Sequence, residues 1–139
     1  MIELSNTTTQ TIEPGEIATF DTTLLHTGCG ECHRRNTGVV NLNARGNCRQ
    51  KPIYEVFFNG NVGGAAGTQA NLVVGIGVSN LPETTMTATI TAATDVYNVS
   101  AHTFVSDCCD NFDSLSIRNV GTAAVTLAAN PSFAIRRIS

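Results

Sequence analysis

The chain has 139 residues with a formal net charge of −3, and 42% of its residues are hydrophobic while 14% are charged. This composition favours one packed domain over a disordered chain, which would combine low hydrophobicity with high net charge. The acidic balance argues against a general nucleic-acid binder. No apolar run approaches the roughly 20 residues that span a bilayer, so we expect no membrane anchor. Residues 1–6 are polar, so we expect no ordinary secretion signal.

The first segment, residues 1–15, is rich in Thr and ends in the turn dipeptide Pro14-Gly15. We therefore interpret 1–15 as an N-terminal arm and 16–139 as the folded domain. In chain order, the apolar runs predict strands at 17–20, 39–42, 54–58, 71–78, 85–91 and 97–105, and then around Leu115 and Ile117, Val125 and Leu127, and Phe133 and Ile135. No stretch of ten or more residues has a helical period, so we predict one all-β domain, an antiparallel sandwich, jelly roll or barrel.

Some of these strands carry apolar residues on both faces. Phe57 lies beside Phe58, and Val73 lies beside Val74, although neighbouring residues of a strand point in opposite directions. Such a strand needs cover on its second face, and contact with identical chains would supply it. The alternative is that a single sandwich and its loops cover both faces. Of the two, the pattern favours self-association.

The cysteines are the most unusual feature of the sequence, and the five of them are Cys29, Cys32, Cys48, Cys108 and Cys109. Cys29 and Cys32, followed by His33, have the spacing of half a zinc knuckle and are candidate metal ligands. A second such pair is absent, which leaves disulfides (for example Cys48 or Cys32 with Cys108 or Cys109) or free thiols as alternatives. We expect structural cysteines and no cofactor.

Two further features concern chemistry and charge. No nucleophile elbow and no His-Glu-x-x-His motif accompanies the three histidines, so we expect no catalytic residue and no enzymatic activity. The densest positive segment is 45–51, with Arg45, Arg49 and Lys51. Arg forms bidentate contacts with carboxylates, so this segment is a candidate contact for an acidic partner, and a solvated loop with ordinary ion pairs is the alternative.

Several runs resemble known families. The segments 17–21, 38–42 and 54–58 resemble the opening strands of tumour-necrosis-factor-like (TNF-like) jelly rolls, which include complement-type globular heads, and 115–121 with 134–138 resemble their last strands. More narrowly, the chain resembles small proteins of this fold encoded among phage and prophage structural genes of Firmicutes. The motifs that carry this resemblance are Cys32-His33-Arg34, Asn47-Cys48-Arg49, Glu83-Thr84-Thr85-Met86, Tyr97-Asn98-Val99-Ser100-Ala101 and Cys108-Cys109.

The resemblance implies an antiparallel jelly-roll sandwich that forms a homotrimer and acts by binding. It implies a phage capsid decoration or stabilising protein, assembled in the host cytoplasm and located on the virion surface, whose partner is the major capsid protein or another virion protein. Arg45, Arg49 and Lys51 then become candidate capsid contacts, and the arm could lie along the capsid. Candidate trimer-interface residues are Tyr54, Phe57, Phe58, Tyr97 and Phe104.

Two alternatives remain at this point. One is a fibre-head or adhesin domain that binds a carbohydrate or a host surface. It would be favoured by shallow loop-end pockets lined with aromatic residues, whereas the chain has two Tyr and no Trp. The other is a small metal-binding protein built on the Cys and His residues.

Overall fold

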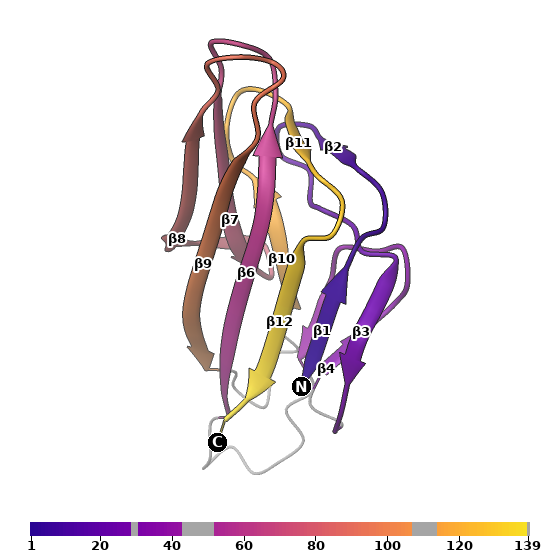
Figure 1. Cartoon of the computed structure of the whole chain (residues 1–139). Helices are drawn as coiled ribbons and strands as arrows, with labels where there is room; N and C mark the ends of the chain where they lie inside the picture. The colour runs from indigo at the N-terminus through magenta and orange to yellow at the C-terminus, as the bar shows by residue number, and fades with distance from the viewer. Residues whose placement is uncertain (29–30, 43–51, 107–113, 139) are drawn as a thin grey trace.

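The computed structural model describes residues 1–28, 31–42, 52–106 and 114–138. Within these ranges the chain forms two antiparallel sheets, which pack face to face as an elongated sandwich (Figure 1). The predicted all-β domain is therefore confirmed. Among the same residues, no helix is long and apolar enough to cross a membrane.

Within the described part of the chain, the larger sheet has seven strands. They are β1 (Ile2–Ser5), β2 (Gln10–Ile12), β3 (Thr22–His26), β6 (Ile53–Gly63), β9 (Tyr97–Ser106), β11 (Val125–Leu127) and β12 (Ser132–Arg137). β6 is its longest member and pairs with β9 along one edge and with β12 and β11 along the other. β1 then joins β12, and β3 pairs with β1.

Over the same described residues, the smaller sheet has five strands in the order β4 (Glu31–His33), β5 (Val40–Leu42), β10 (Ser114–Asn119), β7 (Gln69–Ile76) and β8 (Ser79–Thr89). The hydrophobic core lies between the two sheets, where alternate residues of each strand point inward. The Phe133 ring lies 5.4 Å from the Phe20 ring and 6.3 Å from the Phe58 ring, between ring centroids. All three side chains are fully buried.

Residues 1–15 were expected to form an arm separate from the domain. They instead supply two strands of the larger sheet. β1 pairs with β12 and β3, and β2 pairs with β11. Ile2, Leu4 and Ile12 are buried in the core. The reason is the alternation of Ile2 and Leu4, which places both side chains on the inward face of a strand.

The strand predicted at 17–20 is not a regular strand. The segment makes isolated bridges at Ile17 and Phe20. Between them, the side-chain amide of Gln10 replaces a strand partner, since its Oε1 accepts from the Thr19 backbone N–H at 2.8 Å and its Nε2 donates to the Thr19 carbonyl at 2.8 Å. A side chain from another segment therefore satisfies these backbone groups without a sheet ladder.

A β-bulge explains the two neighbouring valines of β7. The register between β7 and β8 shifts between Leu72 and Val74, and both Val73 and Val74 are buried. The hydroxyl of Thr84 accepts from the Val74 backbone N–H at 2.8 Å and donates to the Leu81 carbonyl at 2.7 Å. Val73 is thus covered within the chain, so it does not indicate a second chain as the sequence suggested.

Candidate functional site

The outward face of β9, β6 and β12 brings apolar and charged side chains together on the larger sheet. In the strand register, Phe57 lies between His102 and Ala134, and Glu55 lies between Phe104 and Arg136. Because side chains alternate along each strand, these residues share one face. Phe57 is 40% exposed and Phe104 is 55% exposed. We call the surface made by Glu55, Phe57, His102, Phe104, Ala134 and Arg136 the aromatic face.

The rings of the aromatic face form a continuous strip. The centroid of the His102 ring lies 6.4 Å from that of Phe57 and 5.1 Å from that of Phe104, with the latter pair edge to face. Edge-to-face contact directs the positive rim of one ring at the negative face of the other. The strip is therefore held in place within one chain while a large part of both Phe side chains remains exposed.

An ionic cluster borders this strip. His102 Nε2 lies 2.9 Å from Glu55 Oε1, and Arg136 Nη2 donates to Glu55 Oε2. The hydrogen bond from Arg136, followed by that from His102, holds the pKa of Glu55 below its ordinary value of 4.5. Glu55 is therefore ionised at neutral pH, and its charge is matched by Arg136.

A hollow of about 270 Å³ opens beside the strip and is lined by Met1, Glu55, Phe57, Ala134 and Arg136. The Phe57 ring and Ala134 supply its apolar part, and the Glu55–Arg136 pair supplies its charged rim. Such a combination of an aromatic surface, Arg and a polar rim is typical of protein–protein contacts.

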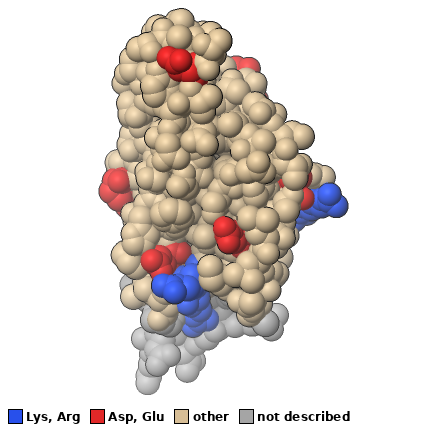
Figure 2. Space-filling view, in the orientation of Figure 1, with Lys and Arg blue, Asp and Glu red and all other residues tan. Residues whose placement is uncertain are grey.

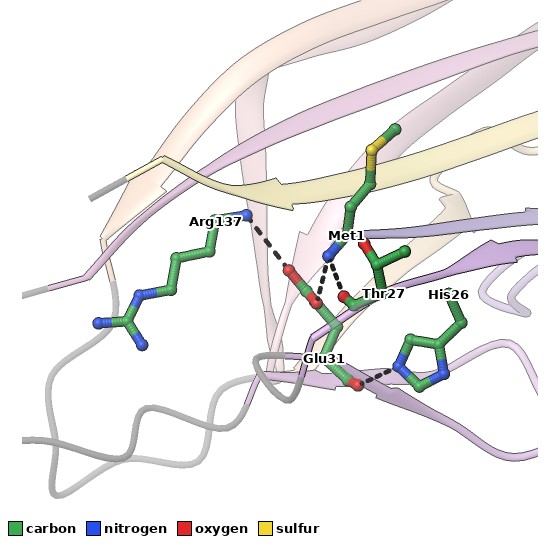
Figure 3. A network of polar contacts seen from close by, with 5 residues as sticks. All are labelled: Met1, His26, Thr27, Glu31 and Arg137. Carbon is green, nitrogen blue, oxygen red and sulfur yellow. Dashed lines mark hydrogen bonds and ion pairs between the residues drawn. The ribbon is translucent and has the colours of Figure 1, made fainter.

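The buried carboxylate of Glu31 fixes the chain beside this hollow (Figure 3). Its Oε2 lies 3.1 Å from the Met1 ammonium, which also donates to the Thr27 carbonyl at 2.6 Å. Its Oε1 accepts from the Arg137 backbone N–H at 3.2 Å. The Glu31 carbonyl oxygen lies 3.1 Å from His26 Nε2. One side chain from the smaller sheet thus ties β1 to the end of β12.

The same outward face continues with uncharged amides. Asn98 Nδ2 donates to Asn59 Oδ1 at 2.7 Å and to Asn61 Oδ1 at 3.1 Å. Figure 2, which views the larger sheet, shows few charged side chains above its lower end. Charged side chains resist removal from water, so a largely uncharged face is well suited to being covered.

Two of the predicted trimer-interface residues cannot contribute their side chains to a surface. Tyr54 and Phe58 are fully buried, because they alternate with outward residues of β6 and point into the core. That part of the prediction is corrected. Phe57 and Phe104 are exposed and are brought onto one face as neighbours of His102. Tyr97 is half-buried at the other end of β9, where its hydroxyl lies 2.7 Å from Thr91 Oγ1.

The sequence shows Glu55, His102 and the basic pair at Arg136, but it does not indicate that they form one cluster. Their pairing joins strands far apart in the chain, since Glu55 and Arg136 are 81 positions apart. The available signal was the alternation of Glu55 with Tyr54 and Val56, which places the carboxylate on the face opposite the core.

Other predicted site residues fall mostly outside the described part of the chain: Cys29, Cys48, Cys108, Cys109, Arg45, Arg49 and Lys51. Cys32 is described, is exposed on β4 and has a free thiol. His33 Nε2 lies 2.9 Å from the Thr37 carbonyl oxygen. Within the described ranges, no group of three His, Cys, Asp or Glu side chains could hold a metal ion.

A second hollow, of about 370 Å³, lies at the end of the sandwich away from both chain termini (Figure 1). It is formed by the loops that follow β6 and β8 and by β11, and most of its lining residues are Gly, Ala and Thr. None of its described lining residues is aromatic. It therefore lacks the ring platform that sugar recognition by a fibre head would favour.

No protein-family profile matches the chain, and no curated protein matches it in sequence. Solved structures are similar to it in fold. Eiger TNF from S. frugiperda has a TM-score of 0.66 at 8% identity, covering 99% of this chain and 91% of its own. The globular domain of zebrafish complement 1qA has a TM-score of 0.62 at 13% identity, covering 99% and 98%. The PRD1 vertex protein P5 has a TM-score of 0.53 at 14% identity, covering 99% and 97%.

At these identities the likeness establishes the fold. The predicted TNF-like jelly-roll sandwich is confirmed, since both sheets and nearly the whole chain align with a TNF structure.

Proposed function

We propose that this chain is a non-enzymatic structural virion protein of a phage, which forms a homotrimer and decorates or stabilises the capsid surface. The observation that carries the proposal is the aromatic face, where the side chains of Phe57 and Phe104 are exposed on the outward side of the larger sheet. Exposed aromatic patches of this kind mark contact surfaces.

The charges of the face fit a surface that becomes covered. Glu55 and Arg136 already neutralise each other within one chain, so contact with a second copy buries no unmatched charge from this pair. The amides of Asn59, Asn61 and Asn98 already bond to one another, which lowers their cost of leaving water. The number of three chains is taken from the TNF-like fold and is an argument by analogy.

The capsid role is supported by two separate likenesses. The fold is similar to that of the PRD1 vertex protein P5. The sequence motifs resemble those of small proteins encoded among phage structural genes. A closed three-chain assembly presents three identical contact sites, so a weak attachment of each chain to the major capsid protein becomes strong through avidity.

The first test is the native mass of the purified chain, measured by sedimentation equilibrium. We expect three times the chain mass. Phe104→Asp places a charge on the aromatic face and should yield a single chain, because an unpaired carboxylate resists burial. The matched control is Val78→Asp, an exposed apolar position in the turn between β7 and β8, which should remain trimeric. A single-chain mass for the unaltered protein would contradict the homotrimer.

The second part of the test addresses the capsid. The unaltered protein should bind empty phage capsids saturably in a co-sedimentation assay. Phe104→Asp should bind them at least ten times more weakly, since a single chain loses avidity on the order of 10²-fold or more. A stable trimer that does not bind capsids would support the homotrimer and contradict the capsid role.

A further inference from the structure

We propose that His102 makes contact between aromatic faces sensitive to pH, with mild acid separating the chains. This inference rests on the proposed homotrimer and adds a regulatory property to the same surface. It follows from the position of one titratable ring among matched charges.

His102 occupies the centre of the aromatic face. Its ring lies between the rings of Phe57 and Phe104, and its Nε2 lies 2.9 Å from Glu55 Oε1. The His102 side chain is 47% exposed in the single chain, so water and protons reach it there. A second copy that covers the Phe57 and Phe104 rings would also cover the His102 ring between them.

The charges around His102 already balance, so an additional proton would give a covered face a net positive charge. Glu55 from β6 carries one negative charge, and Arg136 from β12 already pairs with it. Met1 lines the neighbouring hollow, and its ammonium is paired with Glu31. With neutral His102, the Glu55–Arg136–His102 group is uncharged. With protonated His102, each chain contributes one positive charge to the contact.

That extra charge opposes assembly for two reasons. Burial removes water from the imidazolium, and symmetry brings the equivalent charges of all copies into one contact region. In the separated chain, water solvates the protonated ring, and the Glu55 carboxylate oxygen 2.9 Å away pairs with its charge. Protons therefore bind more tightly to separated chains, and acid shifts the equilibrium toward them.

The Glu55 carboxylate is not the group that changes charge in mild acid. Its hydrogen bonds with Arg136 and His102 hold its pKa below 4.5, so its carboxylate stays ionised through mildly acidic conditions. Histidine changes charge between about pH 5 and 8. Taking up one proton per chain should lower the association constant by up to about tenfold per chain for each pH unit.

The experiment compares association constants at about pH 8 and about pH 5.5, measured by sedimentation equilibrium at constant ionic strength. The readout is the ratio of the two constants, so a change in overall affinity does not affect it. The unaltered protein should show a large ratio. His102→Gln retains a donor for Glu55 without a charge change and should bring the ratio close to one. The control His33→Gln alters a histidine of β4 in the other sheet and should keep the large ratio.

Four results would overturn the proposal. Equal association constants of the unaltered protein at both pH values would contradict the pH response and would agree with the homotrimer. An acid response that survives in His102→Gln would assign it to another group. A single chain at both pH values would overturn the homotrimer and the pH response together. Circular dichroism at the lower pH must show intact sheets, because dissociation through unfolding would also contradict a role for His102.

Discussion

At the scale of single residues, the Asn119 side chain makes three hydrogen bonds to backbone groups. It is fully buried at the end of β10. Its Nδ2 donates to the carbonyls of Ile12 and Ala123, each at 2.9 Å, and its Oδ1 accepts from the Gly121 backbone N–H at 2.9 Å. One amide thus joins the two sheets and shapes the turn after β10.

Asn119→Ala should lower the free energy of unfolding by about 2–4 kcal/mol, because it leaves one buried and two part-buried backbone groups without their side-chain partner. The measurement is urea denaturation at fixed protein concentration. Asn80→Ala serves as the matched control, since Asn80 is exposed and, among the described residues, its side chain accepts a single hydrogen bond, from Arg118 at 3.3 Å. The control should change the free energy by less than about 0.5 kcal/mol. Equal, small effects of the two substitutions would contradict the structural role of Asn119.

At the scale of elements, β1 decides whether the first residues belong to the domain. Leu4 is fully buried in the core, whereas Thr8, four residues later, is exposed. Leu4→Ala should lower the free energy of unfolding by about 2–5 kcal/mol through the cavity it leaves. Thr8→Ala should leave it nearly unchanged. Urea denaturation distinguishes the cases, and a negligible effect of Leu4→Ala would restore the interpretation of 1–15 as a separate arm.

Elements with strict alternation could be predicted from the sequence. The inward set Tyr54, Val56 and Phe58 identifies β6, and the pattern of β12 is equally regular. Two features could not be predicted because they depend on partners remote in the chain. Gln10 satisfies the backbone of Thr19 in place of a strand, and Thr84 supports the bulge that buries Val73.

The candidate site was predicted in part. The aromatic residues of β6 and β9 were named, but assigning an inward or outward direction to Phe57 and Phe58 requires the position of the core. The structure sets Phe57 outward and Phe58 inward. The Glu55–Arg136 pair joins two strands that become neighbours only when β12 returns to pair with β6, so nothing local in the sequence indicates it.

At the scale of the whole molecule, self-association should contribute to thermal stability. Binding between folded chains stabilises them by mass action, so the melting temperature of the unaltered protein should rise with protein concentration. Phe104→Asp should melt at a temperature that does not depend on concentration. Differential scanning calorimetry over a range of about 100-fold in concentration provides the measurement. A concentration-independent melting temperature for the unaltered protein would argue against a trimer in equilibrium with its folded chains.

The alternation along β6 also has a consequence for how the sequence can evolve. Even-numbered residues from Tyr54 to Gly60 point inward, and odd-numbered residues from Glu55 to Asn61 point outward. Point substitutions at the odd positions would alter what the surface recognises without changing the volume of the core, whereas inserting one residue would exchange the two sets. A lineage with this strand can therefore acquire new partners by single substitutions while its architecture persists. Insertions and deletions should be confined to the turns between strands.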